Sequence, residues 1–274
     1  QRDVSFSFYI CSNLKWINMK NSYFKFVSGA ALAVAFSLAS CHSVYDVTKV
    51  EGRMQPIDSV YDVNPDAEAV ALLSPYKAKI DSMMYRVVGT AEMSMDRGIP
   101  ESLLSNLVAD VLRGAAVQVL GKPADMGLVN IGGLRNVLTE GPVTCGNIYE
   151  ILPFENSLCV VTLKGTELNH LFENIAACGG EGVSGVQLHI TKDGKLLRAT
   201  VAGKPVVEDR MYTVATIDYL ADGNDGMTAL IRAEKRECPQ GATLRSLFMD
   251  YVERQTAAGK KITSRMEGRI TVED

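Results

Sequence analysis

Apolar residues recur at helical spacing in four stretches of this 274-residue chain. One helix is predicted from about Ala67, and a second over 101–120, which follows Pro100 and ends at Gly121. The same spacing predicts helices over 166–177 and 243–255, each with one apolar side turned inward.

Shorter apolar runs predict strands between these helices. They cover 126–129, 157–163, 186–190, 196–201, 211–217 and 269–272. Residues 186–190 alternate with period two, and a polar turn joins them to 196–201 as a hairpin. Helices and strands mix without strict βαβ alternation, so the sequence predicts an α+β fold in a single domain.

The N-terminal segment has the pattern of a targeting signal. Met19 is followed by Lys20 and Lys25, and then by an apolar stretch over 26–38 that is too short to span a bilayer as a mature helix. The stretch ends Leu-Ala-Ser-Cys at Cys41, which is the order of a bacterial lipoprotein signal with a lipidated cysteine. The alternative is an ordinary signal peptide with a chance cysteine.

This pattern predicts the layout of the chain. Residues 1–40 should comprise upstream residues and the lipoprotein signal peptide, 41–66 a linker punctuated by prolines, and 67–274 the folded domain. The mature protein is expected to be exported and anchored through Cys41 to the bacterial envelope, facing the periplasm or the cell surface.

Charge and cysteine content narrow the functional classes. Without residues 1–40 the chain holds 24 Lys+Arg and 31 Asp+Glu, a net charge of −7, which gives no electrostatic footprint for a nucleic-acid polymer. The four cysteines after Cys41 are widely spaced and form no CxxC motif. We interpret Cys159 as a small buried hydrophobe, although export permits a disulfide between some pair.

Three loops at the ends of apolar runs carry the candidate chemistry. They are residues 130–135 (Asn-Ile-Gly-Gly-Leu-Arg), 152–156 (Leu-Pro-Phe-Glu-Asn) and 218–226 (Asp-Tyr-Leu-Ala-Asp-Gly-Asn-Asp-Gly). Together they offer a guanidinium, an amide, a carboxylate and two aromatic rings. That set suits a nucleotide, which combines a planar base, a diol and an anion.

Each candidate also has a plainer interpretation. Gly132 and Gly133 permit close backbone approach beside Arg135, but they also suit a tight turn with a solvated arginine. Phe154 and Tyr219 could enclose a base or lie in the core. The acidic residue of the third loop, Asp225, could accept ribose hydroxyls or only stabilise its own turn. The case for a site therefore rests on their joint occurrence in order.

The order and spacing of these segments resemble the C-terminal, substrate-binding domain of the 5'-nucleotidase / UDP-sugar hydrolase family. The family pattern runs roughly E-S-x-x-G-N-L-x-x-D-x-x-R, N-G-G-G-I-R, L-P-F-G-N, an S-G turn and G-G-D-G-Y. The similarity covers roughly residues 85–272 and implies that family's mixed α/β sandwich. The matching positions outside the three loops are Glu101, Ser102, Asn106, Leu107, Asp110, Arg113, Ser184 and Gly185.

The resemblance also implies roles for individual residues. Phe154 and Tyr219 match the rings that stack on the base, and Asn156 matches the residue that bonds the base edge. Asp225 matches the residue that holds the ribose, and Arg135 the one that meets phosphate or sugar. The predicted substrate-binding set is Asn130, Gly132, Gly133, Arg135, Phe154, Asn156, Gly185, Tyr219 and Asp225.

The chain departs from the family pattern at four positions, where Ser105, Ile131, Glu155 and Asn224 replace glycines. Asn224 is a mild change because asparagine tolerates left-handed backbone geometry. We expect a carboxylate at Glu155, beside the base slot, to repel phosphate and alter base preference. Arg97 is the nearest candidate for a further phosphate contact.

Hydrolysis in this family requires two metal ions held by a cluster of His, Asp and Asn residues. The chain has three histidines, at 42, 170 and 189, in none of the required patterns. We therefore predict no catalytic residue, metal ligand or cofactor in this chain, and divalent metals only in a partner metallophosphoesterase.

Three functional interpretations follow. In the first, the chain is the nucleotide- or nucleoside-binding half of a split 5'-nucleotidase, inactive alone, with a separately encoded metallophosphoesterase subunit as its partner. In the second, it is a stand-alone lipoprotein that binds nucleotides or UDP-sugars without hydrolysing them. The third interpretation is a structural relic of the domain.

Overall fold

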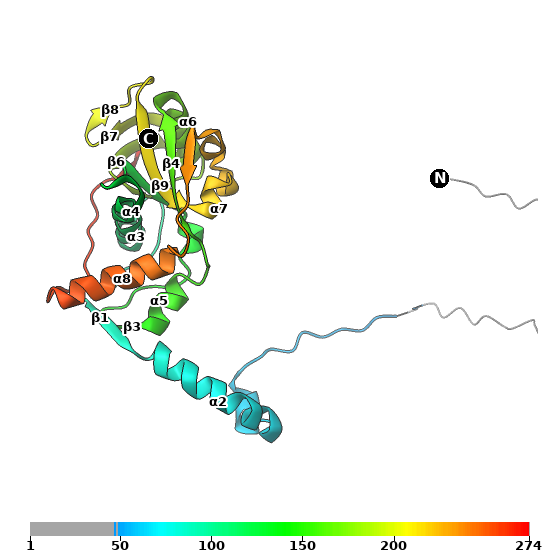
Figure 1. The fold of residues 1–274 in the computed structure, drawn as a ribbon. Coiled ribbons are helices and arrows are strands. Elements are labelled where there is room, and N and C mark those ends of the chain that lie inside the picture. Colours follow the sequence, from blue (N-terminus) through cyan, green and yellow to red (C-terminus); the bar gives the residue numbers. More distant parts are fainter. Residues whose placement is uncertain (1–46, 48, 274) are drawn as a thin grey trace, which may run out of the picture. The chain divides into compact units, whose positions relative to one another are not determined.

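The structure is a computed structural model that describes residues 47 and 49–273. The chain divides between Asn64 and Pro65 into two compact units. The described part of the first unit contains the short 3-10 helix η1 (Ser59–Val63), which Asp58 caps by accepting a hydrogen bond from the Val60 amide. The second unit contains all the other helices and strands that are described (Figure 1).

The second unit mixes helices and strands along the chain, as the sequence predicts. Its helices are α2 (Ala67–Met84), α3 (Leu103–Ala115), α4 (Val117–Leu120), α5 (Cys145–Ile151), α6 (Gly165–Ala177), α7 (Asp218–Ala221) and α8 (Leu244–Ala257). Its strands are β1 (Val87–Ala91), β2 (Met126–Val129), β3 (Gly141–Thr144), β4 (Leu158–Lys164), β5 (Gly182–Ser184), β6 (Val186–Thr191), β7 (Leu196–Val201), β8 (Lys204–Pro205), β9 (Met211–Ile217), β10 (Lys235–Glu237) and β11 (Ile270–Glu273).

A five-stranded sheet in the order β10-β4-β9-β2-β5 is the centre of the fold. Strands β2 and β9 run parallel, and the other neighbours are antiparallel. Every residue of β2 is buried, as its continuous apolar run predicts. Helix α3 packs on β2, β5 and β9, and α8 packs on α3.

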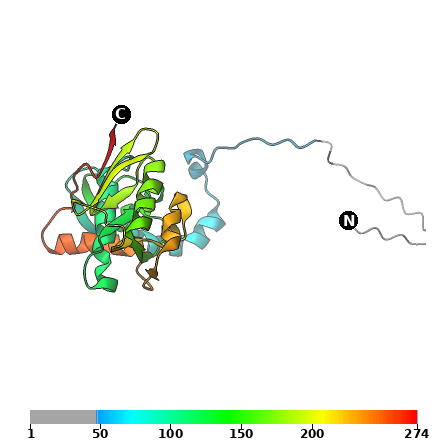
Figure 2. The same ribbon diagram turned by 90° about the horizontal axis from the view of Figure 1, so that it is seen from above.

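A four-stranded sheet, β11-β6-β7-β8, forms the second layer. The predicted hairpin joins β6 and β7 in antiparallel register, and β6 buries alternate residues because its apolar positions have period two. Helix α6 contacts both sheets, since it packs on β4 and β9 and also on β6 and β7. Figure 2 shows the same layers from above.

Two predicted helices differ in detail from expectation. The helix expected over 101–120 is interrupted at Ala116, so α3 and α4 are separate, and Gly121 ends α4 with the positive φ of 70° that favours glycine. Leu103–Leu120 has the length and composition of a membrane span, but half of that window is buried inside the fold, as in a core helix. In α2 the apolar positions are exposed, including Leu73 at 59% and Tyr76 at 66%.

Candidate functional site

The strand register brings the three predicted loops to one end of the five-stranded sheet. Strands β2 and β9 are parallel, so the loops that follow Val129 and Ile217 leave from the same end. Strand β4 is antiparallel to β9, and its first residue, Leu158, pairs with Ile217. The loop before β4 therefore joins the other two, although 82 residues lie between the first and third segments along the chain.

A cavity of about 320 Å³ lies between these loops. This volume is at the lower end of the range for small-molecule sites, on the order of 300–1,000 Å³. Eight residues line it, and all eight belong to the predicted substrate-binding set: Asn130, Gly132, Gly133, Arg135, Phe154, Asn156, Tyr219 and Asp225.

The first loop presents backbone and one guanidinium to the cavity. Its residues Ile131–Gly133 form a 3-10 turn, η2. A Cβ on Gly133 would come within 2.7 Å of Asn130 Oδ1, so a larger residue here would displace the Asn130 side chain. Arg135 is exposed and donates through Nη1 to the Gly132 carbonyl at 3.2 Å. Arg97 Nη1 lies 3.4 Å from the Ile131 carbonyl, so this second arginine also adjoins the loop.

A polar network joins the first and third loops. Asn130 Nδ2 donates to Asp225 Oδ2 at 2.7 Å, and the Tyr219 hydroxyl donates to Asp225 Oδ1 at 2.8 Å. This hydrogen bond raises the pKa of Tyr219. Asp225 has a φ of 52°, and the adjoining glycines at 223 and 226 also have positive φ, which allows the tight turn that aims its carboxylate.

The network leaves one acceptor unused. Asn130 is 5% exposed, and its Oδ1 has no hydrogen-bond partner among the described residues. Its amide orientation follows from the neighbouring carboxylate, because only Nδ2 can donate to Asp225. A buried unpaired acceptor costs free energy that a hydroxyl or N–H of a ligand would recover.

The two aromatic rings are half exposed at the cavity, with Phe154 at 48% and Tyr219 at 40%. They come from the loop before β4 and from α7. Exposed rings of this size lose favourable burial unless a ligand covers them. The arrangement therefore suits a flat, partly apolar group.

The loop of Phe154 is held from behind by Arg245 of α8. The buried guanidinium donates to the carbonyls of Leu152 and Pro153, each at 3.1 Å, and stacks 4.1 Å from the Tyr149 ring. It also pairs with Glu155. The expectation that Glu155 would repel phosphate is thus weakened, because its carboxylate is neutralised by Arg245 and does not line the cavity.

Gly185 is the one predicted binding residue that lies elsewhere. Strand β5 is antiparallel to β2, with Gly182 opposite Val129 and Ser184 opposite Gly127. The residue after β5 therefore lies at the opposite end of the sheet from the cavity. There Gly185 has a φ of 77° and lines a different depression beside Arg113.

Sequence reasoning missed Glu181, which precedes β5 and so lies at the cavity end. This residue is 9% exposed, and its Oε2 accepts the Ile131 N–H at 2.5 Å. Burial raises the pKa of Glu181 to about 7, the Ile131 hydrogen bond opposes the shift, and the nearby Asp225 adds to it. The sequence does mark this position, because the run Gly179-Gly180-Glu181-Gly182 places a charged residue among glycines just before a buried strand.

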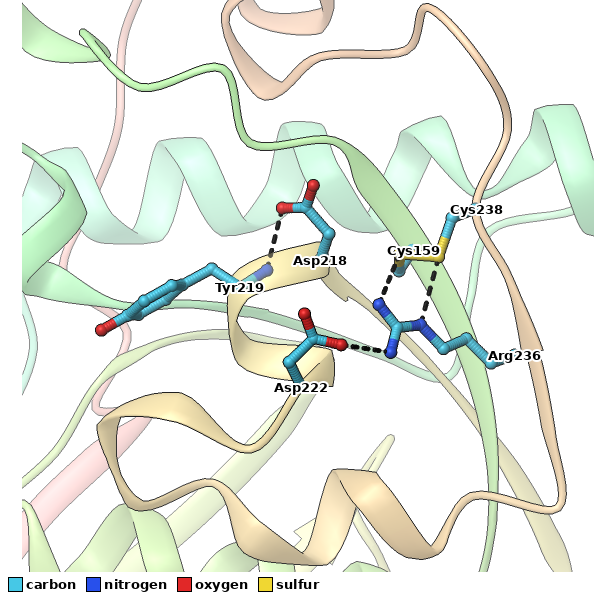
Figure 3. Close-up of a disulfide and its surroundings, with 6 residues drawn as sticks. All are labelled: Cys159, Asp218, Tyr219, Asp222, Arg236 and Cys238. Atoms are coloured by element: carbon cyan, nitrogen blue, oxygen red, sulfur yellow. Dashed lines mark hydrogen bonds and ion pairs between the residues drawn. A yellow bond between two sulfur atoms is a disulfide. The ribbon is translucent and has the colours of Figure 1, made fainter.

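Cys159 is buried, as the sequence indicates, but it is also half of a disulfide that the sequence could not assign. Its partner is Cys238, which follows edge strand β10 (Figure 3). Antiparallel pairing of β10 with β4 brings the two cysteines together across 79 residues. Arg236 donates to both sulfur atoms and to Asp222 at the end of α7, so the disulfide adjoins the helix that carries Tyr219 (Figure 3).

Metal ligands are not grouped in the described part of the chain. No set of three His, Cys, Asp or Glu side chains there has a metal-binding arrangement. His170 pairs with Glu173, and His189 lies between Glu273 and Arg198.

Comparison with known proteins identifies the family. The model of the 5'-nucleotidase C-terminal domain matches residues 87–232, more than half of the chain. The chain therefore belongs to the 5'-nucleotidase C-terminal domain family, which confirms the resemblance and the fold class. All eight residues that line the cavity lie within the matched segment.

The chain is similar to parts of several individual proteins. The fold is similar to that of a 5'-nucleotidase precursor from Thermus thermophilus, with a TM-score of 0.64, 29% identity and coverage of 76% of this chain and 43% of that one. The sequence is 29% identical to endonuclease YhcR of Bacillus subtilis, over 71% of this chain and 17% of YhcR. It is 28% identical to the cell wall protein Lmo0130 of Listeria monocytogenes, over 76% of this chain and 29% of Lmo0130. The chain thus spans well under half the length of these relatives.

Proposed function

We propose that this domain binds nucleosides and nucleotides in the cavity at the end of the five-stranded sheet, as the substrate-binding half of a 5'-nucleotidase. The observation that carries the proposal is that eight residues predicted from the sequence to bind substrate line one cavity, although they come from three separate loops. The family membership supports a nucleotide ligand. The unpaired Asn130 Oδ1 supports a ligand with hydrogen-bond donors.

The cavity offers one position for each part of a nucleotide. The base lies between Phe154 and Tyr219, with the Asn156 amide at its edge. The ribose hydroxyls donate to Asp225 and to Asn130 Oδ1. Arg135, exposed at the rim, meets the phosphate with its planar fork.

Phosphate ester hydrolysis is assigned to a partner. We propose that a separately encoded metallophosphoesterase chain supplies the two divalent metal ions, which stabilise the attacking and leaving oxygens. This chain contributes substrate position, because fixing the base and ribose orients the phosphate for in-line attack.

Calorimetric titration with AMP, UMP and adenosine tests the binding proposal. Phe154→Ala and Tyr219→Ala should each weaken adenosine binding about 5- to 150-fold, since a base-aromatic contact contributes roughly 1–3 kcal/mol. Asp225→Asn should weaken adenosine binding but leave the 2',3'-dideoxy analogue nearly unchanged. Tyr85→Ala is the matched control, because Tyr85 is 72% exposed and does not line the cavity. Absence of binding by the wild type at millimolar ligand would favour a structural relic.

Phosphate release tests the division of labour. The purified chain with Mn²⁺, Mg²⁺, Co²⁺ or Zn²⁺ should leave AMP and UDP-glucose intact, and a metallophosphoesterase encoded beside it should restore turnover. Turnover by the chain alone that a mutation in this chain abolishes would contradict the split arrangement. Binding without any activating partner would instead favour a stand-alone binding lipoprotein.

We further propose that the protein is exported and lipid-anchored at Cys41, which lies outside the described residues. The lipoprotein-like signal supports this, as does the Cys159–Cys238 disulfide, because disulfides persist in oxidising compartments. The similarity to a cell wall protein points the same way. Intact mass of the membrane-extracted protein should show a chain that begins at Cys41 and carries acyl groups. A mature chain without acyl mass would overturn lipid anchoring.

A further inference from the structure

A buried carboxyl group lies directly behind the cavity wall. Glu181 lies at the start of β5, and its Oε2 accepts the N–H of Ile131, the residue next to the lining residues Asn130 and Gly132. One layer of backbone therefore separates this carboxyl group from the ligand space. None of the functions assigned above uses it.

The charge of Glu181 is not neutralised by a cation in the described part of the chain. The structure records no ion pair for Glu181 within residues 49–273, and its electrostatic neighbour is a second acid, Asp225. The nearby Cys178 is a thiol whose pKa is raised by burial, Glu181 and Asp225, so it stays uncharged near neutral pH. The two arginines of this region, Arg97 and Arg135, donate instead to the carbonyls of Ile131 and Gly132.

We propose that Glu181 determines which ligand charge the cavity accepts: its ionised carboxylate disfavours phosphate-bearing ligands and leaves uncharged nucleosides unaffected. This inference rests on the proposed nucleotide site and adds a specificity residue to it. The physical reason is that charges inside a protein are poorly screened by water and salt. Two carboxylates at one wall repel an anionic ligand, whereas a neutral ribose and base meet only hydrogen-bond acceptors.

The same geometry makes the discrimination pH-dependent. The pKa of Glu181 is about 7, so the residue is neutral at pH 6 and ionised at pH 8. Lowering the pH across this range removes one negative charge from the wall, and binding of phosphate-bearing ligands should tighten. Protonation keeps the loop in place, because a neutral carboxyl oxygen still accepts the Ile131 N–H.

Calorimetry with UDP-glucose and uridine at pH 6 and 8.5 tests the inference. The diphosphate of UDP-glucose keeps a constant charge over this range, so a change in its affinity reports the protein. Wild type should bind UDP-glucose about fivefold more tightly at pH 6, which is the order of magnitude for removing one repulsive charge from a partly hydrated site. Glu181→Gln, which imitates the protonated acid, should remove this dependence and bind at pH 8.5 as wild type does at pH 6. Uridine affinity should change less than twofold in all cases.

Glu173→Gln is the matched control, because it removes a carboxylate that is 60% exposed on α6 and should behave as wild type. A second measurement needs no variant. The number of protons taken up by wild type on ligand binding at pH 7 is measured by calorimetry in buffers of different ionisation enthalpy. Binding of UDP-glucose should be accompanied by uptake of a fraction of a proton, and binding of uridine by none. Persistence of the pH dependence in Glu181→Gln, an equal dependence for uridine, or no proton uptake would overturn the inference. Failure of wild type to bind either ligand would instead overturn the proposed nucleotide site, and this inference with it.

Discussion

The two ends of the five-stranded sheet both carry polar side chains, but they use them differently. At the end away from the cavity between the three loops, Arg269 is 8% exposed and every nitrogen of its guanidinium is bonded. It meets Asp110, Glu267 and the carbonyls of Asn106 and Val183, while Ser184 donates to Asp110. At the cavity end, Asn130 Oδ1 and the carboxylate of Glu181 lack comparable partners within the described residues.

Whether the polar groups are paired distinguishes a structural cluster from a candidate binding site better than the volume of the cavity does. The depression beside Arg269 has a volume of about 760 Å³, more than twice that of the cavity between the three loops. Asp110, Glu267 and Arg269 nevertheless satisfy one another there, so a ligand that bound them would have to displace existing bonds. The smaller cavity offers one unpaired acceptor, Asn130 Oδ1, and two half-exposed rings, which a ligand could bind without displacing existing bonds.

The largest expected effect concerns the disulfide that secures the cavity end. Replacing Cys159 and Cys238 by alanine should lower the free energy of unfolding by about 4 kcal/mol, because the bond closes a loop of 79 residues. Urea denaturation of the oxidised protein and of the double variant measures this. Cys145→Ala is a less drastic control, since Cys145 is a free thiol. A loss below about 1 kcal/mol would show that the edge strand does not depend on the bond.

Substitutions at the opposite end of the sheet should lower the stability of the fold without changing nucleoside binding. Arg269→Met should destabilise the fold by about 3 kcal/mol, because it leaves Asp110 and Glu267 without their buried partner. Nucleoside affinity of the folded protein should stay within twofold of wild type. Arg265→Met is the control, since Arg265 is 83% exposed and pairs with the same Glu267, and should cost under about 0.5 kcal/mol. Equal losses for the two variants would mean that the cluster is not a structural unit.

Glu181 gives the cavity end a pH dependence of stability. Its folded pKa of about 7 lies above its ordinary value of 4.5, so the folded state binds the proton more tightly than the unfolded state. The penalty for the buried charge is therefore absent below pH 4.5, grows as the pH rises from 4.5 to about 7, and is complete above 7. Glu181→Gln should be about 2–3 kcal/mol more stable than wild type at pH 8 and nearly equal to it at pH 4.5. Urea denaturation at the two pH values measures this, and a pH-independent difference would contradict it.

The sequence predicted the residues that line the cavity better than the residues that hold the lining loops in place. Phe154, Asn156, Tyr219 and Asp225 could be found because each lies in a loop next to a strand with a clear apolar pattern. Gly185 lies apart from these residues because of the direction of β5, and no local pattern in the sequence encodes the direction of this three-residue strand. The positions of a loop and of its neighbours across the sheet depend on strand order, which a single sequence does not specify.

The residues behind the cavity could not be predicted for a related reason. Arg245 supports the Phe154 loop from a helix about 90 residues later, and nothing at its own position marks it as different from an exposed arginine. Cys159 and Cys238 become partners only through the pairing of β4 with β10. Contacts between single residues that lie far apart in the sequence could therefore be identified only in the structure.

The smallest expected effect contrasts two exposed arginines at the two ends of the sheet. Arg135→Met at the cavity should weaken AMP binding about fivefold, since an exposed ion pair contributes up to about 1 kcal/mol. Adenosine affinity should change less than twofold, because adenosine has no phosphate for the guanidinium to meet. Arg210→Met is the control, since Arg210 lies beside Asp125 just before β2, at the opposite end, and should leave both ligands unaffected. Calorimetry with AMP and adenosine on the three proteins decides the matter. Equal weakening of both ligands by Arg135→Met would show that Arg135 supports the first loop through the Gly132 carbonyl and does not contact phosphate.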